Sequence, residues 1–265
     1  MHHRPSILLC DMGDTLIRWT GYDRERGLRS LRKYCDHPER FDLATLVERG
    51  IALDRELEER ADASLLEFRE ADFLHAIFGT IGIILRGSDD EVEARYWSEA
   101  LTFDPEPGVA SALERISAAG VRLGVISNTI FGPGVIEHEL TRQDLLRFFE
   151  RPLLTSARYG TRKPHPLLFE VALGLFGVTR EESWYIGNSR YHDVGGATAA
   201  GLTAVWYNTG GLAAGMPDEA AHPDAAAAPD AEPAPGAEPE RSPAPVPIHE
   251  VASWAACAEL IETLS

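Results

Sequence analysis

The ten residues from Ile7 to Leu16, Ile-Leu-Leu-Cys-Asp-Met-Gly-Asp-Thr-Leu, constrain the fold of this chain more than any other stretch. Four apolar residues that stop at an acid are typical of a buried parallel strand with Asp11 at its carboxyl end. Ligands of open α/β sheets bind just outside the carboxyl ends of the strands, so a carboxylate there is placed for chemistry. A single strand followed by Asp is more often explained by a helix or turn cap, but three later stretches favour a nucleophile.

Composition narrows the class of protein. The chain has 265 residues, of which 44% are apolar, and this is enough to bury a core. Its formal net charge of -17 argues against nucleic acid or an anionic membrane as a partner, but a small anionic substrate remains compatible beside local cations or a metal ion. Three widely spaced cysteines indicate neither a disulfide framework nor a zinc site. With no long apolar run, we expect a cytoplasmic protein.

Residues 19–102 lack strand-like patterning and instead show apolar residues at spacings of three and four. This pattern predicts four helices, at residues 24–36, 43–64, 65–77 and 89–100. Because no strand there could pair with the sheet, we expect a separate all-helical cap. Its aromatic and basic side chains either line a substrate site or belong to the core and surface of the cap. The residues in question are Trp19, Tyr22, Arg69 and Trp97.

The α/β pattern resumes after residue 102. We expect strands at residues 121–126, 152–154, 183–186 and 203–207, with helices at residues 109–119, 135–140, 143–149 and 167–176. Alternation of strands and helices in this way favours a Rossmann-like parallel sheet.

Two of these strands lead into polar residues suited to an anion. Ser127 and Asn128 end one strand, and their hydroxyl, amide and backbone N–H groups can hold anion oxygens. Lys163 lies beside Pro164 and Pro166 at the amino end of a helix, where N–H groups and the ammonium together favour negative charge.

A third strand leads into Asn188 and Asp193. Facing Asp11 across the crevice, these two side chains would make an all-oxygen site for Mg²⁺. Asp193 also lies at the start of the next helix, which it could cap instead.

The end of the chain changes character twice. Residues 211–247 consist mainly of Ala, Pro, Asp and Glu with nine prolines, which predicts a disordered acidic linker. Residues 248–265 return to helical periodicity, and we expect a helix that docks on the core. The expected organisation is therefore a core at residues 1–18 and 103–210, a cap at 19–102, the linker at 211–247 and the C-terminal helix at 248–265.

Taken together, the four strand ends resemble the haloacid dehalogenase superfamily of phosphotransferases and hydrolases. Asp11 with Thr15-Leu16 resembles the first motif, Ser127 the second, Lys163 the third, and the stretch from Gly187 to Asp193 the fourth. The resemblance covers residues 5 to about 208, with a helical cap of the kind that the family inserts after its first motif.

What this resemblance implies is an aspartyl-phosphate mechanism. Asp11 would attack phosphorus, while Ser127 and Lys163 would hold the transferring phosphoryl oxygens. A Mg²⁺ ion would be held by Asp11, the Gly13 carbonyl, Asn188 and Asp193.

Two residues depart from the family pattern. Gly13 stands where the phosphatases carry a second Asp that acts as general acid and base, a role commonly worth about 10²- to 10⁴-fold. The neighbouring Asp14 either takes over this role or bonds the turn. Asn188 stands where a metal-binding Asp is usual, so we predict weaker metal binding.

The sequence thus favours an enzyme, a Mg²⁺-dependent phosphatase of a small phosphorylated metabolite, with a preference for good leaving groups. A metal-free C–halogen hydrolase is less favoured because Lys163 and Asp193 suit a phosphate. A binding or regulatory protein without turnover is the third possibility, supported by Gly13 and Asn188. The substrate itself and the oligomeric state have no readable signal in the sequence.

Overall fold

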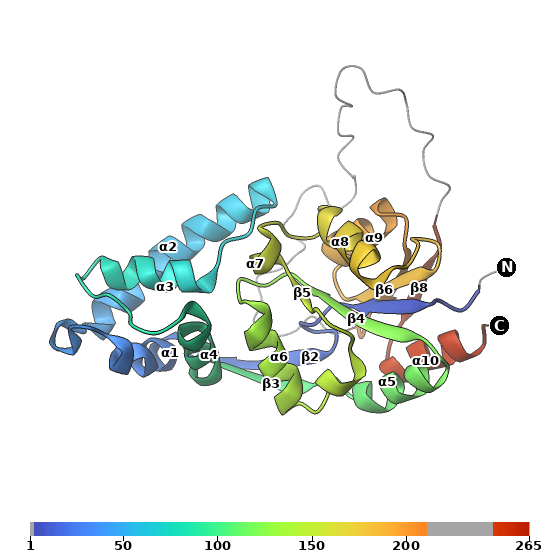
Figure 1. The fold of residues 1–265 in the computed structure, drawn as a ribbon, viewed down its shortest axis with the longest axis horizontal. Helices are drawn as coiled ribbons and strands as arrows, with labels where there is room; N and C mark the ends of the chain where they lie inside the picture. Colours follow the sequence, from blue (N-terminus) through green and yellow to red (C-terminus); the bar gives the residue numbers. More distant parts are fainter. Residues whose placement is uncertain (1–2, 211–245, 265) are drawn as a thin grey trace, which may run out of the picture.

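The computed structural model describes residues 3–210 and 246–264. Six parallel strands form one sheet in the order β5-β4-β1-β6-β7-β8 (Figure 1). Their bounds are β1 Ile7–Cys10, β4 Arg122–Ser127, β5 Leu154–Thr155, β6 Ser183–Gly187, β7 Thr203–Tyr207 and β8 Ile248–Val251. The expected Rossmann-like α/β class is confirmed, and the strand that ends at Asp11 lies in the middle of the sheet.

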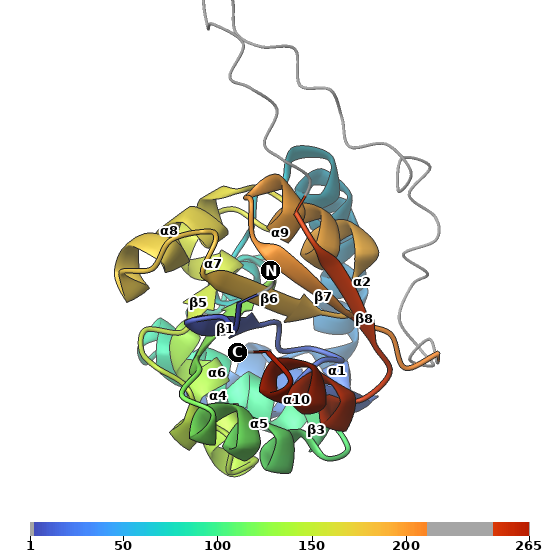
Figure 2. The ribbon, with the colours of Figure 1, turned by 90° about the vertical axis from the view of Figure 1, so that its right-hand side faces the viewer.

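Helices cover both faces of this sheet (Figure 2). On one face lie α8 (Leu167–Phe176) and α9 (Gly196–Ala199), and on the other lie α5 (Val109–Ala118), α6 (Pro133–Arg142) and α10 (Trp254–Glu262). Alternate residues of β1 belong to two separate apolar clusters, Leu8 and Cys10 to one, Ile7 and Leu9 to the other. Burial on both faces explains why the first strand is a continuous apolar run.

The segment between β1 and α5 contains two strands that the sequence pattern did not predict. β2 (Ile17–Tyr22) and β3 (Leu101–Pro105) pair antiparallel with each other and form a ribbon apart from the main sheet. The expectation that residues 19–102 are all helical is therefore wrong at both ends. Pairing between the two ends of the insertion satisfies their backbone groups without using the sheet.

Four helices fill the insertion and lie together beyond one end of the sheet (Figure 1). They are α1 Arg24–Ser30, α2 Leu43–Ser64, α3 Glu70–Gly79 and α4 Asp89–Ala100, and we call residues 23–100 the cap. The helix expected at 65–77 begins only at Glu70, because Leu65 takes a left-handed conformation (φ 56°) and ends α2. Leu66 then forms an antiparallel bridge with Thr161 of the core. The helix expected at 24–36 ends at Ser30 and continues as a 3₁₀ turn.

The C-terminal segment also differs from the expectation. Residues 248–251 form β8 at the edge of the sheet instead of the first turn of a helix, because they supply the backbone partners that β7 lacks on that side. The helix α10 begins at Trp254, whose buried indole N–H donates to the backbone O of Thr15 (2.6 Å). The helix α10 thus docks on the core. The linker predicted at residues 211–247 lies mostly outside the described residues.

Smaller differences occur around the second half of the core. Residues 143–149 form only a 3₁₀ turn (Leu146–Phe148), and a short helix α7 (Ser156–Tyr159) follows β5. Within the ranges that the structure describes, no helix is both long and apolar enough to cross a membrane. The cytoplasmic location stays a prediction.

Candidate active site

Asp11 follows β1 directly and is buried at the carboxyl end of the sheet. Its Oδ1 accepts a hydrogen bond from the Lys163 Nζ at 2.8 Å, and its Oδ2 accepts one from the Thr15 hydroxyl at 3.2 Å. The sequence analysis placed both residues after strands of the sheet, and the structure brings their side chains into contact. A carboxylate oxygen held beside an ammonium is the arrangement that a nucleophilic aspartate needs for attack on an anion.

Lys163 is 1% exposed and lies in the loop before α8. Its ammonium contacts three acceptors, Asp11 (2.8 Å), Asp193 Oδ1 (2.6 Å) and the Tyr185 hydroxyl (2.6 Å), which matches its three N–H donors. Burial alone would lower the pKa of Lys163, but the two carboxylates outweigh it and the pKa is raised. The lysine is therefore charged at neutral pH.

Asp193 faces this lysine instead of capping its helix. Its Oδ2 accepts from the Ser189 backbone N–H at 2.9 Å, and the helix cap is supplied by the Ser189 hydroxyl. The carboxylate packs so closely on Gly187 that a Cβ there would lie 2.3 Å from it. Glycine before Asn188 is thus required by the position of Asp193.

Two carboxylates and one ammonium leave the cluster with an excess of negative charge. Burial raises the pKa of Asp11 to about 6, with Lys163 lowering it and Asp193 raising it further. The ammonium of Lys163 is the group that favours the ionised form of Asp11. The uncompensated charge also favours a cation at the site.

Tyr185 is the member of the cluster that the sequence did not reveal. It lies on β6, where it follows the pattern of a buried strand residue, and its hydroxyl accepts from Lys163. The same hydroxyl can donate to the backbone O of Ile126 or to Asp193 Oδ1, both at 3.1 Å. A tyrosine inside a fully buried strand needs a hydrogen-bond partner for its hydroxyl. This requirement was the sequence signal that could have pointed to Tyr185.

Asn128 positions Lys163. Its amide donates to the Lys163 backbone O at 3.0 Å and accepts from the Lys163 backbone N–H at 2.7 Å. This differs from the expectation that the side chain itself binds substrate. Ser127 is buried at the end of β4, next to Asn128, and a contact between its hydroxyl and a phosphate stays a prediction.

Asp14 and Gly13 form the turn after Asp11. Asp14 takes a left-handed conformation (φ 52°), and its Oδ1 accepts from the Trp19 backbone N–H at 3.4 Å. This contact corresponds to the alternative in which Asp14 bonds the turn. A Cβ built on Gly13 meets nothing within 4 Å, so the space beside the nucleophile is open.

The predicted Mg²⁺ ligands provide a suitable set of hard oxygen donors. Asp11 Oδ2 and Asn188 Oδ1 lie 3.2 and 3.5 Å from the same Thr15 hydroxyl, so the two oxygens converge. No group of three or more acidic, histidine or cysteine side chains able to hold a metal occurs among the described residues. Asp11 and Asn188 supply oxygens of the kind that Mg²⁺ prefers, whereas both oxygens of Asp193 accept from Lys163 and Ser189, and the Mg²⁺ site stays a prediction.

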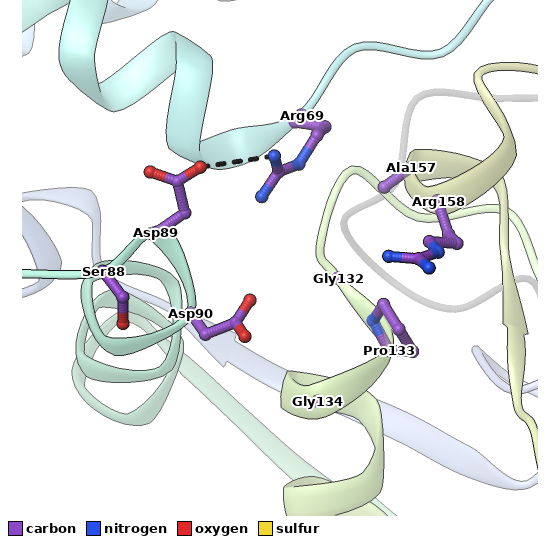
Figure 3. Close-up of a pocket in the computed structure, with 9 residues that line it drawn as sticks. All are labelled: Arg69, Ser88, Asp89, Asp90, Gly132, Pro133, Gly134, Ala157 and Arg158. Carbon is purple, nitrogen blue, oxygen red and sulfur yellow. Dashed lines mark hydrogen bonds and ion pairs between the residues drawn. The ribbon is translucent and has the colours of Figure 1, made fainter.

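Two cavities lie near the cap, and neither is lined by Asp11. The larger, of about 440 Å³, separates Arg69 and the start of α4 from Arg158 and the start of α6 (Figure 3). The smaller, of about 170 Å³, is lined by residues that include Trp19 and Tyr22. Trp97 is buried and donates to Glu139 at 3.0 Å, so it belongs to the packed interior.

The fold and this site define a class of proteins that have a parallel Rossmann-like sheet with a buried aspartate and lysine in contact at its carboxyl edge. Residues 85–207 match the family model described as haloacid dehalogenase-like hydrolase. The matched segment, residues 85–207, is thus haloacid dehalogenase-like, in agreement with the resemblance that the motifs indicated.

Known relatives match this chain in part. It is 34% identical to a glyceraldehyde 3-phosphate phosphatase of Pyrococcus abyssi over 39% of this chain and 42% of the relative. It is 31% identical to a phosphoserine phosphatase of Thermus thermophilus over 54% of this chain and 55% of the relative. The chain thus spans about half the length of these relatives. The solved structure of a 2-haloacid dehalogenase from Pseudomonas syringae shares the fold, with 20% identity, a TM-score of 0.59 and coverage of 98% of this chain and 100% of that chain.

Proposed function

We propose that this protein is a Mg²⁺-dependent phosphatase of a small phosphorylated metabolite that acts through an aspartyl-phosphate intermediate. The observation that carries the proposal is the buried contact of 2.8 Å between the Lys163 ammonium and Asp11 at the end of the central strand. The names of the partial relatives, glyceraldehyde 3-phosphate phosphatase and phosphoserine phosphatase, support the same reaction class.

In the first step a carboxylate oxygen of Asp11 bonds to phosphorus, and the bond between phosphorus and the leaving oxygen breaks. Water then attacks phosphorus, which releases inorganic phosphate and restores the carboxylate. Lys163 already touches the nucleophile, so its ammonium is placed to contact a phosphoryl oxygen during both steps. Tyr185 and Asp193 fix its position. Such transition states depend mainly on positioning and charge neutralisation.

The residues that would hold Mg²⁺ are Asp11, the Gly13 carbonyl, Asn188 and Asp193. When bound, the ion would neutralise negative charge on the phosphate and on the nucleophile. Asp193 already accepts from Lys163, Tyr185 and Ser189, so its first role is to hold the lysine. Asn188 carries no charge, and we therefore expect weaker metal binding than a carboxylate would give.

Protonation of the leaving group is the step with least support from the side chains. Gly13 has no side chain that could donate a proton, and the carboxylate of Asp14 accepts a hydrogen bond from the Trp19 backbone N–H in the turn. Without a general acid, alkoxide leaving groups depart slowly, whereas aryloxides and the carboxylates released from acyl phosphates need little assistance. We therefore expect aryl and acyl phosphates to be hydrolysed faster than alkyl phosphates.

The direct test is phosphate release from p-nitrophenyl phosphate with Mg²⁺ by the wild type and by Asp11→Asn. We expect the variant to lose about 10³-fold or more of the activity, because the nucleophile is removed. Undiminished activity in Asp11→Asn contradicts the mechanism. A folded wild type that releases phosphate from no member of a broad panel points to a binding protein, and metal-independent halide release from haloacids points to a dehalogenase.

A further inference from the structure

The smaller cavity lies between the cap, the ribbon and the loop after β4. It is lined by Trp19, Tyr22, Arg24, Asp54, Glu70, Phe73, Tyr96, Leu101, Ile130 and Phe131. Its volume of about 170 Å³ holds several non-hydrogen atoms. Aromatic side chains form much of the lining, and the charged groups come from the cap.

Glu70 is the unusual member of this lining. Glu70 is 3% exposed, and its carboxylate makes no hydrogen bond or ion pair within residues 3–210 and 246–264. The backbone N–H of Glu70 donates to the Ile130 backbone O at 2.8 Å, which fixes the residue against the core. Burial raises the pKa of the carboxyl well above its usual range; the charges of Asp54 and Glu93 add to the effect and that of Arg24 opposes it. A buried acid without a partner is unfavourable unless a ligand supplies one.

The other charged and hydroxyl groups that line the cavity already pair with one another. Arg24 bonds Asp54 at 2.5 Å, and its guanidinium lies 5.5 Å from the centre of the Tyr22 ring. The hydroxyls of Tyr22 and Tyr96 bond each other at 2.9 Å. Because Arg24 pairs with Asp54, Glu70 is the lining acid that has no cation bonded to it, and a bound cation would favour its ionised form.

We propose that this cavity binds the organic part of the substrate and that Glu70 accepts hydrogen bonds from an ammonium group on it. The inference rests on the proposed phosphatase function, whose substrate class it narrows to phosphate monoesters with a primary amine. A cation satisfies the unpaired carboxylate and is also attracted by the aromatic rings around it, among them Trp19 and Tyr22. A neutral hydroxyl would supply a hydrogen bond without the charge.

Two of the segments that line the cavity follow active-site residues along the chain. Trp19 lies on the ribbon strand that follows the Asp11 turn. Ile130 and Phe131 follow Ser127 and Asn128 at the end of β4. The proposal therefore requires a substrate with phosphate at Asp11 to extend along these segments towards Glu70, and amines of different chain length test that requirement.

The experiment compares kcat/KM for 4-aminobutyl, 4-hydroxybutyl and butyl phosphate in the wild type and in Glu70→Gln. We expect the wild type to prefer the amine over the butyl ester by about tenfold or more, since a hydrogen bond to a charged group contributes about 1.5–3 kcal/mol. Glu70→Gln should reduce this ratio at least about tenfold. The matched control is Glu59→Gln, an exposed glutamate of α2, which should keep the wild-type ratio.

A wild type that treats all three esters alike, or that favours the hydroxyl ester as much as the amine, overturns the assignment. So does a folded Glu70→Gln variant with an unchanged ratio. A second measurement, binding of butylammonium followed by NMR, needs no turnover, and Glu70→Gln should weaken it by the same factor. If butylammonium binds as expected but no ester releases phosphate, the proposed phosphatase function fails while the ammonium site stands.

Discussion

The strand-end cluster and the cap cavity both bury carboxylates, but they satisfy them differently. In the cluster, Asp11 and Asp193 each accept from the Lys163 ammonium and from a further donor. In the cavity, the carboxylate of Glu70 has no donor within the described part of the chain. The comparison teaches that the reacting groups are held in place by the protein itself, whereas the cap keeps one acid for a partner from outside.

The largest effect should come from removing the cation on which the cluster depends. Lys163→Met would leave two buried carboxylates facing each other, and losing one partner of a buried ion pair costs about 3–5 kcal/mol. We expect a loss of that size in the free energy of unfolding, measured by urea denaturation, together with loss of phosphatase activity.

The matched control is Lys33→Met, the other lysine of the chain, which is exposed and lies over the Tyr34 ring. Its effect should stay within about 0.5 kcal/mol. If Lys163→Met unfolds at the same urea concentration as the wild type, the cluster is not held together by its charges and the contrast with the cavity fails.

A second change adds a function that the cluster lacks. Because a Cβ at Gly13 meets nothing within 4 Å, Gly13→Asp can place a carboxyl beside Asp11 without displacing other atoms. We expect hydrolysis of alkyl phosphates to rise by about 10²-fold, with a much smaller gain for aryl phosphates, because only poor leaving groups need a proton. Gly13→Asn, which has the same shape but cannot transfer a proton, should show no such gain.

The same assay decides the role of Asp14. If Asp14 already acts as the acid, Asp14→Asn will slow alkyl phosphates far more than aryl phosphates, and Gly13→Asp will gain little. Equal slowing of both substrates argues for the structural role that the contact with Trp19 indicates.

The sequence placed Asp11, Lys163 and Asp193 at one edge of the sheet because each follows a strand. Asp11, Lys163 and Asp193 meet because parallel strands bring their carboxyl ends to one edge of the sheet. Tyr185 was missed because a strand pattern identifies a buried residue but not the polar atom that its hydroxyl reaches. Asn128 was assigned to substrate because the sequence does not show that its amide spans the Lys163 backbone.

The cap was predicted only as helices, and the reason is again physical. The ribbon of β2 and β3 pairs two segments far apart in the sequence, and β8 joins the sheet after a long insertion. Such pairings depend on which edge is available in three dimensions and leave little local pattern. Glu70 had no signal of its own in the sequence, because its place in the cavity depends on the contact of its backbone with Ile130.

The smallest effect concerns the metal ligand that departs from the family pattern. The Oδ1 of Asn188 shares the Thr15 hydroxyl with Asp11 Oδ2, so Asn188→Asp adds a negative charge where the predicted Mg²⁺ ligands converge. We expect the Mg²⁺ concentration for half-maximal activity to fall several-fold, because an additional carboxylate strengthens binding of a hard cation. Activity at saturating Mg²⁺ should change less than this midpoint, which separates metal binding from chemistry. In the absence of Mg²⁺ the same variant should be less stable than the wild type, since the new charge lies beside Asp11. An unchanged midpoint would mean that Asn188 is not a ligand and that the excess charge of the cluster is balanced in another way.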